Sequence, residues 1–526
     1  MARHGKPKNK RKNDEPDLKN IMKGEFPVKR ILFFMICIFL IPAVFAQAGI
    51  TEKNVQLIQA AEKGNLQDVQ TALTDGADIN AISLKKYYGI FAKGVTALIA
   101  AAEKGQTDVV KFLLEKGADL NVNRTPDGIN ALMAASENGH LEVVKLLLNK
   151  GSDLNAKNTD GVTALMLASY GGHNEIVKLL LDKGADVNVK SVSESVTALM
   201  MAAENGHTEV VKLLLEKGAN VNIKRTSDGV TALMLASEKG YPEIVRLLLE
   251  KGANASVKRA LSGATALMAA AENGHTEVVK LLLDKGANVN IKRASNGITS
   301  LMLASENGHT EVIKLLLEKG ADVNIKRIPD DTTALMIASQ NGHTEVIKLL
   351  LNKGADVNIE NTDGLTALTV STQNGHTEVV KLLLEKGANV NVKRVSDGVT
   401  ALMMASQKGY TEIIKLLLNK GADVNVKNTD SLYALIVASQ NGYTEIVKLL
   451  LEKGANVNVK NADGLTALIM ASQNGHTEIV KLLLEKGADV NVQAAIADVD
   501  NTALKVAKKY GRKDIVRILE RAGAKE

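Results

Sequence analysis

A segment of 33 or 34 residues repeats along most of the chain, and this period constrains the fold more than any other feature. The leucine found at position 267 in one copy recurs from Leu98 to Leu504, mostly in steps of 33 or 34 residues. Each copy has two short apolar segments joined by Asn-Gly or a similar pair, and a second Gly follows where a helix C-cap is expected. In the copy at 263–293 these segments are 266–271 and 278–283. The pattern predicts a helix-turn-helix in every copy and one elongated body whose copies contact their neighbours.

The motifs GHTEVVKLLLEKGA and ADVN or ANVN, with this period, resemble those of the ankyrin repeat family from about Asn54 to the end of the chain. With a degenerate first copy around Leu57, fourteen repeats can be aligned. The resemblance implies an all-α solenoid of about 14 helix-turn-helix repeats joined by β-turn fingers. It also implies a concave face, lined by the fingers and inner helices, that binds partner proteins without catalysis.

Most positions within a copy are explained by folding. Thr265 is placed to cap the first helix. Met268 stands where the family has a hydrogen-bonding His, which puts that hydrogen-bond network in doubt and predicts an apolar row in the core. His275 and its equivalents recur in register, but one repeat, about 8 to 10 Å, separates each from the next, whereas zinc needs ligands about 2 Å away. We therefore interpret the histidines as turn residues and expect neither a metal site nor a cofactor.

A signal-peptide pattern precedes the array. Sixteen apolar residues, 31–46, follow Lys29-Arg30 and precede Gln47-Ala48. The run is shorter than the roughly 20 residues that span a bilayer, so we expect cleavage after Ala46 or Ala48 and a periplasmic or secreted protein, as in a bacterial cell. The alternative is a structural spacer anchored in a membrane by an uncleaved segment 31–46. The predicted domains are thus a leader at 1–48 and a repeat array at 49–526. We expect translation to start at Met22. The alternative is a start at Met1, in which case residues 1–21 form a basic tail that contacts nucleic acid or acidic lipid.

Charge and chemistry exclude several functional classes. Of 65 Lys and Arg and 59 Asp and Glu residues, ten and four lie in residues 1–30, which leaves 55 of each sign from Gly49 onward. A formally neutral array gives no support to nucleic-acid binding. Cys37, the single cysteine, would leave with the signal segment, so the mature chain has no thiol chemistry. The G-x-x-x-x-G-K-[ST], H-E-x-x-H and G-x-S-x-G motifs are absent, and we predict no catalytic residue. We expect a monomer.

Because the framework repeats, information about a partner must lie where copies differ, and the fingers differ first. Fingers of the 34-residue copies mostly carry an arginine, whereas those of the 33-residue copies read KNTDG or similar. From Arg225 to Arg327 these side chains would form a ladder of cations at about 10 Å intervals along the concave face. The alternative is a solvated edge partly neutralised by acids such as Asp228. The arginines predicted to bind partners are Arg124, Arg225, Arg259, Arg293, Arg327 and Arg394.

The end of the first helix differs between the two halves of the array. In the first half this position holds Glu103, Glu137, Glu204, Glu238, Glu272 and Glu306, and in the second half it holds Gln340, Gln373, Gln407, Gln440 and Gln473. In the family this position often contacts partners, so Glu272 is a predicted binding residue and the halves would hold different segments. Duplication of two ancestral blocks would leave the same pattern without a functional cause.

An insertion at 81–94 lengthens the first finger. It carries Tyr87, Tyr88 and Phe91, three of the ten aromatic residues that follow the leader. Exposed aromatic side chains on a tethered loop predict a binding hot spot; the alternative is a loop that folds back over the first repeat. At the other end, a capping repeat at 494–526 places charge on helices that have no outer neighbour.

Overall fold

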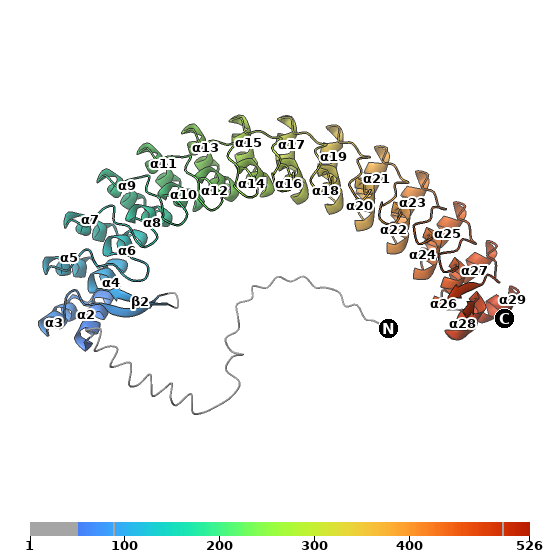
Figure 1. The fold of residues 1–526 in the computed structure, drawn as a ribbon, viewed down its shortest axis with the longest axis horizontal. Coiled ribbons are helices and arrows are strands. Elements are labelled where there is room, and N and C mark those ends of the chain that lie inside the picture. The colour runs from blue at the N-terminus through green and yellow to red at the C-terminus, as the bar shows by residue number, and fades with distance from the viewer. Residues whose placement is uncertain (1–50, 88–89, 497–498, 526) are drawn as a thin grey trace, which may run out of the picture. The chain divides into compact units, whose positions relative to one another are not determined.

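The computed structural model describes residues 51–87, 90–496 and 499–525. The leader predicted at 1–48, with its signal segment, and Tyr88 lie outside these residues. The chain divides into two compact units, Met1–Thr159 and Asp160–Glu526. Each unit is built from consecutive helix pairs (Figure 1).

Unit 1 contains three helix pairs and a hairpin. The strands β1 and β2 are antiparallel, with Lys86 opposite Phe91 and Tyr87 opposite Ile90, and they occupy the long first finger. The elements are α2 (Glu52–Lys63), α3 (Leu66–Thr74), β1 (Ser83–Tyr87), β2 (Ile90–Val95), α4 (Ala97–Glu103), α5 (Thr107–Glu115), α6 (Ala131–Glu137) and α7 (Leu141–Asn149).

Unit 2 contains eleven further pairs. Its first helices are α8 (Ala164–Gly171), α10 (Ala198–Glu204), α12 (Ala232–Lys239), α14 (Ala266–Glu272), α16 (Ser300–Asn307), α18 (Ala334–Asn341), α20 (Ala367–Asn374), α22 (Ala401–Lys408), α24 (Ala434–Asn441), α26 (Ala467–Asn474) and α28 (Ala503–Lys509). Its second helices are α9 (Asn174–Asp182), α11 (Thr208–Glu216), α13 (Pro242–Glu250), α15 (Thr276–Asp284), α17 (Thr310–Glu318), α19 (Thr344–Asn352), α21 (Thr377–Glu385), α23 (Thr411–Asn419), α25 (Thr444–Glu452), α27 (Thr477–Glu485) and α29 (Lys513–Arg521). The short strands β3 (Ala494–Ile496) and β4 (Val499–Asn501) pair before α28.

The α14–α15 pair shows why each copy folds. The Thr265 hydroxyl accepts a hydrogen bond from the Met268 amide at 3.3 Å, which satisfies an unpaired donor of the first turn. A nine-residue helix is unstable alone in water, so burial must hold α15 in place. Its Val278, Val279, Leu282 and Leu283 are buried, and each such side chain contributes about 1.5 to 3 kcal/mol.

First helices pack on first helices and second helices on second helices, so the core of each unit is a thin strip between two rows. In unit 2 the row of first helices lies on the inner, concave side (Figure 1). The Met268 row is buried, as the sequence predicts for a core position. The 28 helices of the described residues confirm the all-α solenoid of about 14 helix-turn-helix repeats, and two fingers add the short hairpins β1–β2 and β3–β4.

Candidate protein-interaction surface

A row of histidines connects neighbouring repeats and fixes their spacing. His309 contacts the carbonyl of Glu272, one repeat earlier, through Nε2 at 3.0 Å. The same contact, at 2.9 to 3.2 Å, is made by His140, His207, His275, His309, His343, His376 and His476. The Met268 row, which stands where the family has His, is buried in the core, and a different set of hydrogen bonds, made by the turn histidines, connects the repeats.

An asparagine ladder ties the other edge of the stack. Asn290 Oδ1 accepts from the Asp322 amide at 2.9 Å, and its Nδ2 donates to the Gly320 carbonyl at 3.0 Å. Equivalent pairs of hydrogen bonds are formed by the side chains of Asn188, Asn222, Asn324, Asn358, Asn391, Asn425, Asn458 and Asn491. These bonds connect the start of each finger to the turn after the second helix of the next repeat.

Four of the six finger arginines are clamped by an aspartate three residues later. Arg327 donates to Asp330 from Nε at 3.0 Å and also from Nη2. The pKa of Asp330 is lowered to about 2, chiefly by these hydrogen bonds from Arg327 and in smaller part by hydrogen bonds from Thr332. The clamped pairs are Arg124–Asp127, Arg225–Asp228, Arg327–Asp330 and Arg394–Asp397.

Arg124 is buried as well as clamped. It is 7% exposed, and it also donates from Nη1 to Glu103 at 3.2 Å. Nearby, burial raises the pKa of Glu137 although Arg124 lowers it. Arg124 is therefore a structural residue of its finger, and the partner-binding role predicted for it is not supported by its position.

Arg259 and Arg293 lack the clamp because Ser262 and Asn296 stand where the other fingers have Asp. Arg259 Nη2 pairs with Glu238, and Arg293 Nη2 pairs with Glu272 at 3.3 Å. Both glutamates are more than 40% exposed at the ends of α12 and α14. Within the described residues, all six arginines form ion pairs, so the predicted ladder of cations is partly neutralised, as the alternative interpretation has it. A partner-binding role for these arginines stays a prediction.

A cleft lies between these two arginines. Its volume is about 430 Å³, and its lining comprises Glu238, Arg259, Ser262, Ala264, Ala269, Glu272, Asn273 and Arg293. Below it, the buried residues Ala264, Met268 and Leu303 pack with Ile291 and Ile298. The cleft lining brings together three predicted binding residues, Arg259, Glu272 and Arg293.

Apolar side chains at the finger tips are not among the predicted site residues, because the period of the repeat says nothing about them. Leu261 is 86% exposed, two residues after Arg259. Val192, Ile328 and Val395 are also exposed at finger tips, and Tyr170 is exposed at the end of α8, where later copies have Glu. Their departure from the polar consensus of the neighbouring fingers is the signal that could have found them.

Two other hollows lie along the second half of the row of first helices. They share Val399, Gln407, Lys408, Asn428 and Leu432, with volumes of about 390 and 410 Å³. Of the residues that both hollows share, Gln407 stands where the first cleft has Glu272 and Asn428 where it has Arg293, whereas Arg394 and Asp397 line one of the two hollows. The two parts of the row therefore offer different chemistry, as the change from Glu to Gln predicts.

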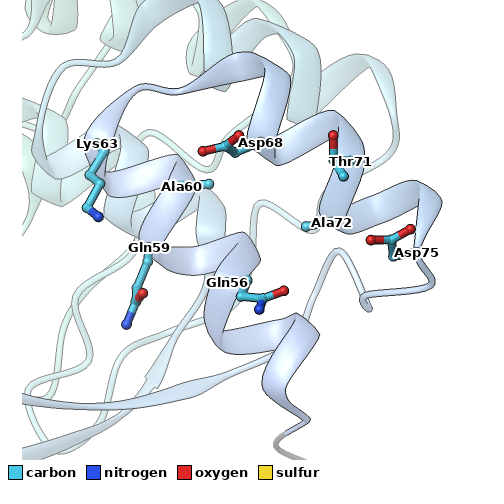
Figure 2. A pocket seen from close by; sticks show the side chains of 8 residues that line it. All are labelled: Gln56, Gln59, Ala60, Lys63, Asp68, Thr71, Ala72 and Asp75. Carbon is cyan, nitrogen blue, oxygen red and sulfur yellow. The ribbon is translucent and has the colours of Figure 1, made fainter.

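A hollow on the first repeat belongs to its end face. Figure 2 shows Gln56 and Gln59 on α2 and Asp68 on α3 around a space of about 270 Å³. The counterparts of these residues in the 263–293 copy are Ala266, Ala269 and Val278. Polar side chains at such positions suit a capping face that has no neighbour on that side. We interpret this hollow as part of the cap.

The predicted aromatic hot spot is described in part. The backbones of Tyr87 and Phe91 lie in the β1–β2 hairpin, whose first strand contacts α2. Tyr88 lies outside the described residues. The binding role of these three residues therefore stays a prediction.

Within the described ranges, no group of three or more His, Cys, Asp and Glu side chains is placed to hold a metal ion. In the same part of the chain, no helix has the length and apolar character needed to cross a membrane.

Stacked helix pairs joined by projecting fingers define a repeat solenoid with an extended contact surface. The family model described as ankyrin repeats (3 copies) matches residues 57–158, 121–191, 165–259, 255–327, 335–428, 402–494 and 435–525. The chain therefore belongs to the ankyrin repeat family. A comparison with curated proteins finds no match. Ankyrin repeats generally serve as protein-binding scaffolds and are typically not enzymes.

Proposed function

We propose that this protein is an exported, non-enzymatic scaffold that binds one or more protein partners along the fingers and the row of first helices. The observation that carries the proposal is the concentration of departures from the repeat on this surface. Arg259, Glu272, Arg293 and the exposed Leu261 all lie there, whereas the outer helices keep the consensus TEVVKLLLE with little change. Arginine is enriched among the residues that contribute most to protein interfaces.

Site-specific photocrosslinking in the native cells tests which surface binds. A photoreactive residue at position 272 faces the cleft, and one at position 280 on α15 faces outward as a matched exposed control. We expect a discrete protein adduct from position 272 and none from position 280. Equal adducts from both positions, or adducts from position 280 alone, would contradict the proposed surface.

Export rests on the signal pattern at 29–48. Fractionation followed by intact-mass measurement tests it separately. A soluble species that lacks residues 1–46 or 1–48 supports export with cleavage. A membrane-bound species that retains residues 31–46 supports the anchored spacer instead, and a mature N-terminus upstream of Ile31 in a soluble species contradicts export.

A further inference from the structure

Arg259 and Arg293 lie on two consecutive fingers. Both fingers lack the aspartate that pairs with the arginine three residues earlier in other fingers. In the Arg225, Arg327 and Arg394 fingers, Asp receives hydrogen bonds from Nε at 2.8 to 3.0 Å and from Nη2. Arg293 Nε is instead buried without a hydrogen-bond partner among the described residues. A buried donor without a hydrogen-bond partner is destabilising, so a guanidinium that turns toward a new acceptor gains stability.

The remaining partners of these arginines are easily exchanged. Within the described part of the chain, one glutamate is the single carboxylate at ion-pair distance from each guanidinium, and it is bound through one nitrogen. Exposed ion pairs of this kind contribute little to stability. A bidentate carboxylate from another molecule is a stronger acceptor for a guanidinium than this contact.

The charge around the cleft favours an acidic ligand. The cleft lining contains two arginines and two glutamates, and each glutamate pairs with one of the arginines. Lys258 and Lys292, each next to one of the two arginines, are exposed and form no ion pair within the described residues. Clustered cations of this kind attract acidic ligands and orient them before contact.

We propose that the cleft between the Arg259 and Arg293 fingers binds an acidic segment of a partner protein, with one Asp or Glu carboxylate on each arginine. The proposal rests on the scaffold function proposed above. Successive repeats are about 10 Å apart. A polyproline II segment advances about 3.1 Å per residue with three residues per turn, so carboxylates on residues three positions apart lie on the same face, about 9 Å from each other. The exposed side chain of Leu261 adds an apolar contact beside the first finger.

Binding of a short peptide to the full-length protein tests this directly. The probe is a Gly-Ser peptide that carries two Asp residues three positions apart and a fluorophore, and fluorescence anisotropy at low salt measures binding. We expect the diasparagine version to bind about tenfold more weakly or worse, because it cannot form the two charged contacts. Absence of diaspartate binding at about 1 mM peptide overturns the proposal. Binding of a diphosphoserine peptide without diaspartate binding also overturns it, in favour of a phosphoprotein partner.

The neighbouring fingers supply the matched variant. The double substitution Ser262→Asp and Asn296→Asp gives both fingers the internal clamp found at Asp228 and Asp330, so the arginines remain while their binding edges become occupied. We expect about tenfold weaker diaspartate binding with no loss of thermal stability. As a control, Asp363→Asn changes the charge of a finger that has Asn361 in place of Arg, and binding should not change. Unchanged binding by the clamped variant overturns the proposal.

The same variant separates this inference from the scaffold function. If the adduct from position 272 survives in the clamped variant, the scaffold function stands and carboxylate recognition fails. If a photoreactive residue at position 272 gives no adduct in the protein without the clamp substitutions, the scaffold function fails, whatever the result with the peptide.

Discussion

At the scale of single residues, the glycine after the first helix of several repeats lies against the histidine ring of the following repeat. Gly274 has φ +76°, and a Cβ built there would lie 2.7 Å from atoms of the His309 ring. Gly286 has φ +82° with nothing within 4 Å of such a Cβ. The two glycines therefore share backbone strain but differ in packing.

Gly274→Ala should consequently destabilise the array more than Gly286→Ala. We expect about 1 to 2 kcal/mol from the positive φ in both variants and about 1 to 3 kcal/mol more from the clash at Gly274. Urea unfolding measures both variants, and a double-mutant cycle with His309→Ala should recover the additional loss. Equal losses for the two glycines would show that the ring contact does not set the spacing.

The Arg327–Asp330 clamp makes a pH-dependent contribution whose direction follows from the lowered pKa. Because the folded pKa of Asp330 is about 2, below the ordinary 3.8, the contribution is complete above about pH 4 and is lost as pH falls through about 2. Linkage allows at most about 2.5 kcal/mol. Both side chains are about a third exposed, so we expect about 1 kcal/mol after solvent screening.

Asp330→Asn should therefore lower the free energy of unfolding by about 1 kcal/mol at pH 7, and the difference from the unmodified protein should vanish near pH 2. Urea midpoints between pH 7 and pH 2 measure this difference. Asp363→Asn, in a finger without Arg, is the control. A difference that persists unchanged at pH 2 would mean that the ion pair is not its cause.

At the scale of elements, the asparagine ladder has one interruption in unit 2. Ser256 stands where the neighbouring copies have Asn222 and Asn290, so the amide of Asn288 lacks the side-chain acceptor that Asn254 and Asp322 receive. Asn at this position could accept from the Asn288 amide and donate to the Gly286 carbonyl, as its counterparts do one repeat away.

Ser256→Asn should stabilise the junction between these repeats by about 0.5 to 1.5 kcal/mol. Hydrogen exchange followed by mass spectrometry reports this locally, as slower exchange in the peptide that contains Asn288. Ser256→Ala is the control, since it supplies neither bond. Exchange that is as fast in Ser256→Asn as in Ser256→Ala would show that the ladder contributes nothing measurable here.

The sequence predicts the elements well because their causes are local. The cap at Thr265 and the Gly after α15 act within one helix, and the 33-residue period carries both through the array. Contacts between copies are less accessible to this reasoning. The Arg293–Glu272 pair joins residues 21 positions apart, and the contact of His309 with Glu272 joins residues 37 apart, so both depend on how the copies stack. The β1–β2 pairing in the insertion was likewise not predicted, since a loop of this composition has no clear strand period.

At the scale of the whole molecule, the polar end faces bear on whether one copy of the chain associates with another. In the last repeat Lys505, Lys508 and Glu520 replace the buried Met268, Ala271 and Leu283 of the internal copy, and Lys508 pairs with Glu520 at 3.7 Å. These charges prevent α28 and α29 from presenting the apolar face that internal repeats use for stacking.

The triple substitution Lys505→Met, Lys508→Ala and Glu520→Leu restores that face, so we expect concentration-dependent association, measured by light scattering after size-exclusion chromatography. The matched control is Lys509→Ala, Lys513→Met and Arg517→Leu, whose counterparts Glu272, Thr276 and Lys280 are exposed in the internal copy. The control should remain at the mass of the unmodified protein because its new apolar groups do not form a stacking face. A triple variant that also keeps this mass, with unchanged helical content, would show that the charges at the end face are not what limits growth of the stack.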